Sequence, residues 1–173
     1  KKDNKGQLLW GDARQSLKRI PQEISFDLIM LDPFSPKNCP ELWTEEFLQG
    51  ISRRLTPGGR LLTYCSAAAV RSTLRRSGLL LRSLTSPSFD SKKWSAGTMA
   101  ILLKKNQKPI QEDFKGQKLS QMEEEHLLTR AAIPYRDPNG CDKACEIRHR
   151  RTQEQLLCQL ESTSSWQRRW FKT

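Results

Sequence analysis

One apolar run, FDLIML at residues 26–31, constrains the fold of this 173-residue chain more than any other segment. Such a run is typical of a strand that is buried on both faces of a parallel sheet. Further strands are expected for QLLW at 7–10, RLLTYC at 60–65, LLLRSL at 79–84 and TMAILLK at 98–104. The sequence therefore predicts a sheet of several strands.

Apolar residues at helical spacing occupy the intervals between these strands. They predict helices over 14–20, 41–55 and 67–76. Pro21 ends the first helix, and the sequence TPGG at 56–59 is expected to end the second and begin a turn. Strands that alternate with helices indicate an open α/β sheet, and the last two strands, joined only by a loop, are expected to be antiparallel neighbours at one edge.

The character of the chain changes after residue 104. We expect residues 1–104 to form the sheet domain and residues 105–173 to form a linker and a mostly helical, basic extension. Within that extension, a helix is expected in LSQMEEEHLLTR, where Ser120 is the predicted N-cap. A charged helix is expected over 141–161.

The charge of the chain indicates the class of partner, and its cysteines indicate the cellular compartment. The formal net charge is +11, which favours polyanionic partners such as nucleic acid. Five cysteines without a paired secretory pattern predict reduced thiols and a cytoplasmic location. No apolar run reaches the roughly 18 residues of a membrane span. Cys141, Cys145 and His149 match no common zinc spacing, so no metal is expected.

Polar residues follow three of the expected strands. They are Gly11 and Asp12, then Asp32, then Cys65 and Ser66. Ligands of an open α/β sheet bind outside the carboxyl ends of its strands, so these residues are expected to line one cleft.

The loop at 32–43 contains an acid and an aromatic residue that together indicate the chemistry of the site. Its three prolines restrict the backbone and so fix the positions of Asp32 and Phe34. A carboxylate can accept hydrogen bonds from a reacting amine, and an aromatic face can stabilise the positive charge that develops on it. The loop is therefore expected to serve chemistry on an amine, such as methyl transfer to nitrogen.

Four segments carry a resemblance to a known family: GDA, FDLIMLDPFSPKNCPELWTEEFL, LTPGGRLLTYCSAAAVRSTLRRSGL and SAGTMAILLK. They resemble the methyltransferase part of the MnmC-like family, and AAIPYRDP at 131–138 resembles its stand-alone members. The resemblance implies a Rossmann-like sheet, S-adenosylmethionine as cofactor and tRNA as substrate. The implied reaction converts 5-aminomethyl to 5-methylaminomethyl uridine at the wobble position. The chain has no counterpart of the FAD-dependent oxidase domain of some relatives, so no FAD is expected.

The resemblance also assigns roles to residues. The catalytic loop would contain Asp32, Phe34 and Pro36. Contacts to the cofactor would come from Gly11, Asp12 and Ala13, together with Asp32. Contacts to the substrate and the tRNA would come from Lys37, Asn38, Trp43, Ser66, Arg71, Lys92 and Lys93.

A glycine-rich loop for the methionine part of the cofactor is not found in the sequence, because the adjacent Gly58 and Gly59 follow an expected helix rather than a strand. We therefore expect this chain to be the C-terminal portion of a methyltransferase and to bind the cofactor poorly alone.

Two other functions remain open at this point. Polyamine synthases also place Gly-Asp after one strand and an Asp-x-x-x-Pro loop after the next, so an aminopropyltransferase is one alternative. The other is a non-catalytic RNA-binding module that keeps the fold without the cofactor half. The strong positive charge argues against the first, because a polyamine substrate is itself cationic.

Overall fold

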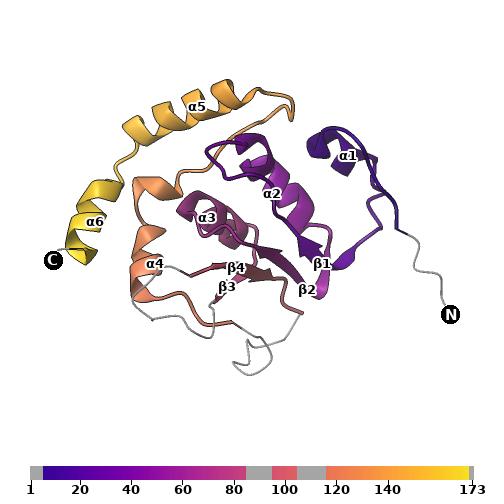
Figure 1. The fold of residues 1–173 in the computed structure, drawn as a ribbon, viewed down its shortest axis with the longest axis horizontal. Helices are drawn as coiled ribbons and strands as arrows, with labels where there is room; N and C mark the ends of the chain where they lie inside the picture. Colours follow the sequence, from indigo (N-terminus) through magenta and orange to yellow (C-terminus); the bar gives the residue numbers. More distant parts are fainter. Residues whose placement is uncertain (1–5, 85–94, 105–115, 172–173) are drawn as a thin grey trace.

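The computed structural model describes residues 6–84, 95–104 and 116–171. Its sheet has four strands in the order β1-β2-β4-β3, namely β1 (Phe26–Met30), β2 (Leu55–Thr63), β4 (Gly97–Ile101) and β3 (Leu80–Leu84). The β1–β2 pair is parallel, and β4 is antiparallel to both β2 and β3. The mixed α/β fold is confirmed, and so is the antiparallel pair at one edge (Figure 1).

The β1 edge corrects two predictions. Residues 7–10 form no strand, and the side chains of Leu8 and Trp10 are 71% and 82% exposed. In β1, Leu28 and Met30 are 51% and 74% exposed, so the interpretation of this strand as buried on both faces is wrong. The reason is that Leu28 and Met30 share one face of the strand, and only the opposite face, which contains Ile29, packs against the main core.

The second expected helix is divided and shorter than predicted. It consists of the 3-10 turn η1 (Pro40–Trp43) and helix α2 (Glu45–Ser52), separated by Thr44. The Thr44 hydroxyl accepts a hydrogen bond from the backbone N–H of Phe47 and so caps α2. An N-cap needs extended backbone, which interrupts the helical path at this residue.

The TPGG segment is part of β2 rather than a turn after a helix. At Gly59, an added Cβ would lie 2.8 Å from the carbonyl oxygen of Thr56 and 3.0 Å from that of Phe26. Glycine therefore permits the close approach of β1 to β2 here. The same region contains the irregularity in their register, between Phe26 and Leu28.

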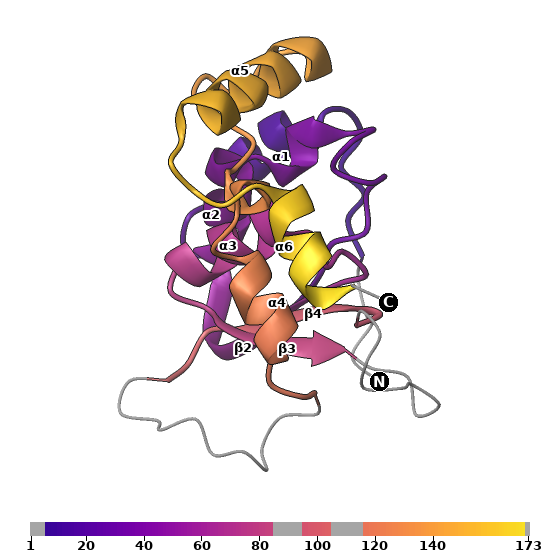
Figure 2. The same ribbon diagram turned by 90° about the vertical axis from the view of Figure 1, so that its left-hand side faces the viewer.

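Three helices cover one face of the sheet. They are α1 (Ala13–Arg19), α2 and α3 (Ala68–Arg76), and they form a layer above the strands in Figure 2. Leu48, Leu61 and Leu74 are fully buried in the core between the helices and the strands. Burial of such side chains contributes about 1.5–3 kcal/mol each.

The C-terminal segment packs around this layer. Its elements are α4 (Gln121–His126), η2 (Arg130–Ala132), α5 (Ala144–Leu157) and α6 (Thr163–Trp170). Helix α5 lies outermost, beyond α1 and α2 (Figure 2). No helix in the described ranges is long and apolar enough to cross a membrane.

Local signals in this segment predicted α4 and α5, whereas α6 was not expected. Ser120 caps α4 as expected, and Glu123 completes a capping box with it. The expected helix over 141–161 is present as the shorter α5. The division of the chain at residue 104 remains a prediction, because 105–115 lie outside the described residues.

Candidate active site

The loop after β1 is attached to the end of β2. Asp32 Oδ1 accepts a hydrogen bond of 3.2 Å from the backbone N–H of Tyr64, and the Tyr64 hydroxyl donates one of 2.6 Å to the carbonyl oxygen of Pro33. No hydrogen bond involving Asp32 Oδ2 is found among the described residues, and the residue is exposed. The loop thus presents a fixed carboxylate that has one oxygen available.

Trp43 anchors the same loop from the side of the hydrophobic core. Its ring is 1% exposed, and its Nε1–H donates a hydrogen bond of 2.7 Å to the carbonyl oxygen of Phe34. Trp43 also meets the Tyr64 ring edge-on, with the ring centroids 6.5 Å apart. In contrast, the Phe34 side chain is 79% exposed. The backbone of Phe34 is therefore anchored while its aromatic face is open to a ligand.

The basic end of the loop lies at the surface. The backbone N–H groups of Asn38 and Cys39 both donate to the carbonyl oxygen of Ser35 at 2.9 Å, which closes a tight turn. Lys37 and Asn38 are exposed, and Pro36 is half-buried. Arg148 of α5 donates a hydrogen bond of 3.2 Å to the carbonyl oxygen of Lys37, so the C-terminal extension contacts this loop directly.

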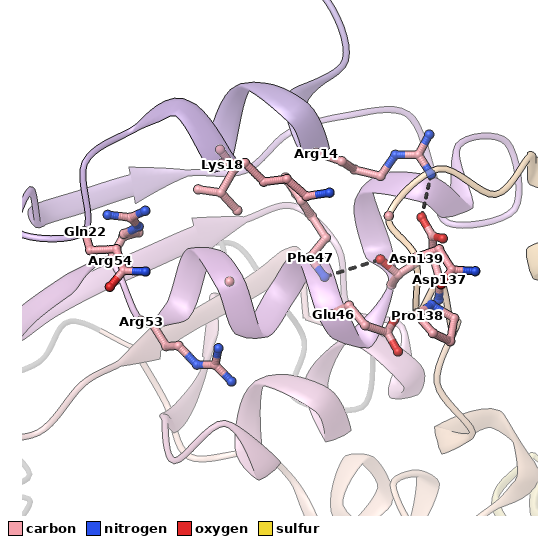
Figure 3. A pocket seen from close by; sticks show the side chains of 14 residues that line it. Arg14, Lys18, Gln22, Glu46, Phe47, Arg53, Arg54, Asp137, Pro138 and Asn139 are labelled. Carbon is pink, nitrogen blue, oxygen red and sulfur yellow. Dashed lines mark hydrogen bonds and ion pairs between the residues drawn. The ribbon is translucent and has the colours of Figure 1, made fainter.

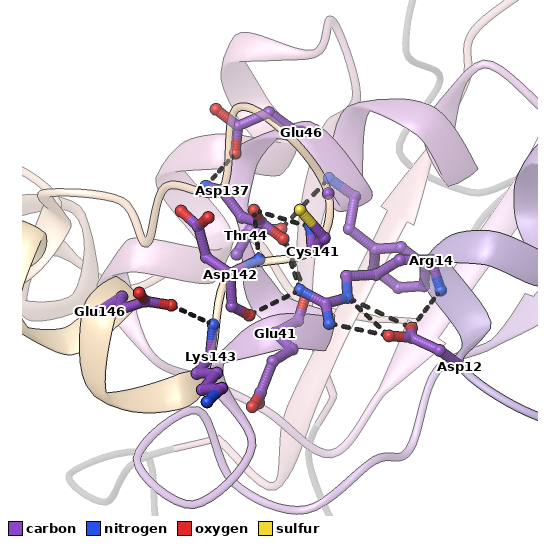
Figure 4. A network of polar contacts seen from close by, with 12 residues as sticks. Asp12, Arg14, Glu41, Thr44, Glu46, Asp137, Cys141, Asp142, Lys143 and Glu146 are labelled. Carbon is purple, nitrogen blue, oxygen red and sulfur yellow. Dashed lines mark hydrogen bonds and ion pairs between the residues drawn. The ribbon is translucent and has the colours of Figure 1, made fainter.

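Asp12 begins α1 and is bound by an arginine. Its Oδ1 caps the helix by accepting a hydrogen bond of 2.8 Å from the backbone N–H of Arg14. The Arg14 guanidinium also forms an ion pair of 2.8 Å with Asp12 and one of 2.5 Å with the buried Asp137 (Figure 4). Hydrogen bonding from Arg14 lowers the pKa of Asp12, although partial burial opposes this shift. Arg14, which Asp12 holds in place, therefore joins the start of α1 to the C-terminal extension.

Charge effects connect side chains of the 32–43 loop with Arg14 of α1 and with Tyr64 at the end of β2. Burial and the charge of Glu41 raise the pKa of the Cys39 thiol, and the charge of Arg14 acts on the same thiol in the opposite direction. Burial raises the pKa of Tyr64, and the charges of Asp32 and Cys39 act in the same direction. Direct hydrogen bonds join the Asp32 loop to the end of β2. The expected strand before Asp12 is not formed, so only two of the three predicted strand ends meet here.

Arg71 lies beneath this rim rather than in it. Its side chain is buried, with hydrogen bonds to Thr98 Oγ1 at 2.8 Å and Ser95 Oγ at 2.5 Å and an ion pair of 2.8 Å with Glu123. Thr98 Oγ1 in turn donates a hydrogen bond of 2.7 Å to the carbonyl oxygen of Cys65. Arg71 therefore supports the strand end from within and has no open face for RNA.

The remaining predicted site residues differ in burial, and two of them lie outside the described residues. Ser66 is half-buried in the turn between β2 and α3, and Ala13 packs partly against the core at the start of α1. Lys92 and Lys93 lie outside the described residues. Cys141 and Cys145 are exposed, and among the described parts of the chain no group of His, Cys, Asp and Glu is arranged to hold a metal ion.

The sequence reasoning missed the contacts of Asp137. Besides its ion pair with Arg14, its backbone N–H donates a hydrogen bond of 2.8 Å to Glu46 of α2, and Arg136 forms an ion pair of 2.8 Å with the same carboxylate. The available signal was the YRDP sequence at 135–138, which places an arginine and an acid before a proline.

Comparison with known proteins identifies the class. A family model described as S-adenosyl-L-methionine-dependent methyltransferase matches residues 1–97. The chain belongs to this family, and the following relatives place it among the MnmC-like methyltransferases.

The crystal structure of MnmC2 from Aquifex aeolicus superposes with a TM-score of 0.73 and 28% identity, covering 87% of this chain and 45% of that one. The bifunctional tRNA 5-methylaminomethyl-2-thiouridine biosynthesis protein MnmC of Delftia acidovorans is 39% identical over 42% of this chain and 11% of its own length. An uncharacterised protein of Methanocaldococcus jannaschii is 30% identical over 83% of this chain and 38% of its own length. The chain thus spans less than half the length of each of these relatives.

Proposed function

We propose that the chain is part of an enzyme that methylates the aminomethyl group of a tRNA wobble uridine, in the cytoplasm. The observation that carries this proposal is the braced 32–43 loop, which presents the Asp32 carboxylate and the Phe34 ring together at the rim of the sheet. The similarity to the MnmC protein of Delftia acidovorans supports the choice of substrate. The methyltransferase family match favours methyl transfer over the aminopropyl transfer that the sequence left open.

Asp32 would orient the amine. Its available oxygen would accept an N–H of the substrate aminomethyl group, which directs the nitrogen lone pair away from the loop. The same negative charge would stabilise the positive charge that grows on nitrogen as the new bond forms. The exposed face of Phe34 would add a cation–π contribution of about 0.5–2 kcal/mol.

The residues at the rim fit one side of the methyl donor. S-adenosylmethionine, when bound, supplies a methyl group from a positively charged sulfur. A negative carboxylate such as that of Asp32 is electrostatically suited to lie near this sulfur. Gly11 has a φ of +108°, and no atom lies within 4 Å of the place where its Cβ would be, so the backbone here leaves open space beside the rim. Gly11, Asp12 and Ala13 would line the donor site on this side, while Asp12 keeps α1 and Arg14 in position.

The other side of the donor site has no counterpart among the described residues. The adjacent pair Gly58 and Gly59 lies in the first half of β2, whereas the rim is formed where β1 and β2 end. Gly58 and Gly59 therefore do not supply the glycine-rich loop that the family uses. This placement supports the expectation that the chain alone binds the cofactor poorly.

Substitution of Asp32 tests the proposal. In the full-length protein, Asp32→Asn keeps the size and one acceptor of the side chain but removes its charge. We expect the rate constant for methyl transfer, measured in single turnovers with tRNA bearing 5-aminomethyl uridine, to fall by about 10²–10⁴-fold. The dissociation constant for tRNA should stay within about threefold, because the charge acts on the reacting amine.

Asp27→Asn is the matched control. Asp27 is an exposed carboxylate of the same strand, and its Oδ1 accepts a hydrogen bond of 2.7 Å from Thr56. Because Asp27 lies near the opposite end of β1, its substitution should leave the rate unchanged. Full activity in Asp32→Asn, or an equal loss in both variants, would remove Asp32 from the reaction.

A further inference from the structure

A second site lies on the helical side of the molecule, in a groove of about 760 Å³. It is formed by α1, α2 and the segment at 137–140 of the C-terminal extension (Figure 3). This volume is within the range of pockets that bind small molecules, about 300–1,000 Å³. The groove extends along α2, from Thr44 at its start to Arg53 and Arg54 beyond its end.

The charged side chains of the groove fall into two groups. Two acids line it, but both are already occupied: Asp137 is paired with Arg14, and Glu46 is paired with Arg136. Arg14 also binds Asp12, so its charge is balanced within the protein. These groups hold the walls of the groove together.

Three further cations of the groove lack a direct ion-pair partner among the described residues, although the charge of Lys18 also lowers the pKa of Asp12. Lys18, Arg53 and Arg54 form no ion pair with any carboxylate in the described ranges. The Arg54 guanidinium donates to the carbonyl oxygens of Ile20 and Pro21, which fix its position but leave its charge uncompensated. Three positive charges without an ion pair in the described ranges lie around one concave surface, and they create a positive potential that attracts anions.

We propose that this groove binds backbone phosphates of the tRNA, a partner that rests on the function proposed above. A run of phosphates fits the groove better than one small anion does, because its cations lie at two places: Lys18 Nζ beside Gly140, and Arg53 and Arg54 beyond the end of α2. Eight helical residues at about 1.5 Å each span about 12 Å. Lys18 faces the groove from α1, and Arg53 and Arg54 follow the end of α2.

The position of the groove relative to the active site supports the same partner. The Asp32 loop leads through η1 directly into α2, so the start of the groove adjoins the catalytic loop in the chain. An RNA strand whose uridine reaches Asp32 can therefore continue along the helix. Phosphate contacts of this kind position a substrate without reading its sequence.

The test is the salt dependence of tRNA binding by the full-length protein. Lys18→Gln with Arg53→Gln removes two positive charges from the groove. The slope of log K against log salt concentration should become shallower by about 1.5, because each lost phosphate contact removes about 0.7–0.9. Lys118→Gln with Arg168→Gln removes two exposed charges outside the groove and should leave the slope unchanged.

A charge-preserving variant and a small-anion titration complete the test. Lys18→Arg with Arg53→Lys should keep the wild-type slope, which separates charge from a change of shape. An equal slope in the wild type and the Lys18→Gln, Arg53→Gln variant would overturn the proposal. Inorganic phosphate that binds the wild type but not this variant, with no change in the tRNA slope, would assign the groove to a free phosphate and would also overturn it.

Failure of this inference can be distinguished from failure of the proposed function. If the tRNA is bound and methylated but the groove charges do not affect the slope, only the groove is assigned wrongly. If the wild-type protein neither binds nor methylates the tRNA, the proposed function itself fails.

Discussion

Asp32 is the residue on which the proposed active site depends most. Its carboxylate is held by a backbone N–H of a neighbouring strand end, so its position depends on the sheet and its reactivity on its exposure. The two aromatic residues of the loop differ in burial. The buried Trp43 anchors the loop, whereas the Phe34 ring is exposed to solvent. The sequence predicted roles for both Asp32 and Phe34, because prolines restrict the loop between them and α2, and these roles stay predictions.

His126 provides a prediction at the scale of one residue. It stacks on the buried Trp166, with the ring centroids 4.4 Å apart, and burial lowers its pKa from 6.5 to about 4, helped by the charge of Arg71 and opposed by that of Glu123. Between these values the unfolded chain takes up a proton that the folded protein does not. The free energy of unfolding should therefore fall as the pH falls from about 6.5 to 4, and His126 should contribute no further loss below that.

Urea unfolding of the full-length protein across this pH range would measure the effect. His126→Phe should flatten the profile between pH 6.5 and 4, whereas His149→Phe, on the exposed surface of α5, should not. The buried Glu123 affects stability at lower pH. Its burial alone would raise its pKa, but hydrogen bonding to Arg71 outweighs this effect and lowers the pKa from 4.5 to about 2. Identical profiles for the wild type and His126→Phe would contradict this account.

At the scale of elements, a buried ion pair joins α3 to α4. The side chains of Arg71 and Glu123 are 1% and 4% exposed, and their atoms are 2.8 Å apart. Loss of one partner of a buried pair leaves an uncompensated charge, which costs about 3–5 kcal/mol. Arg71→Met and Glu123→Met should each lower the free energy of unfolding by about this amount, and the double variant should cost less than the two single losses added.

The same two helices contain a matched control. Arg75 and Glu124 form an exposed pair, with side chains 44% and 45% accessible, so Arg75→Met should cost at most about 1 kcal/mol. Denaturant unfolding of the single and double variants would test both pairs. Equal losses for Arg71→Met and Arg75→Met would show that burial does not determine the strength of this contact.

At the scale of the whole molecule, local signals predicted more than distant contacts did. The Ser120 cap and the α1 and α3 helices depend on residues a few positions apart, so the sequence indicated them correctly. The Arg71–Glu123 pair joins positions 52 residues apart, and no local pattern reveals it. The exposure of β1 was missed for a similar reason, since a strand's pattern does not say which neighbours cover it.

The same contrast applies to the site. The Asp32 loop and the end of β2 could be predicted to meet, because topology places the ends of parallel strands on one rim. The third expected strand end is not found, since residues 7–10 form no strand. The Arg14–Asp137 contact could not, because it joins the rim to a segment 123 residues away. The C-terminal extension thus supports both the rim and the groove, and the position of its 137–140 segment against α1 defines the groove wall.

The most direct test of the central claim is the identity of the methylated nucleoside. The full-length protein would be incubated with tRNA bearing 5-aminomethyl uridine and with methyl-labelled S-adenosylmethionine, and the digested nucleosides would be analysed by mass spectrometry. The account predicts that the label is found on the side-chain nitrogen of the wobble uridine, with the wild type and Asp27→Asn but not with Asp32→Asn. Label on a ring atom, on a ribose or on any other nucleoside would contradict it, as would wild-type labelling by Asp32→Asn.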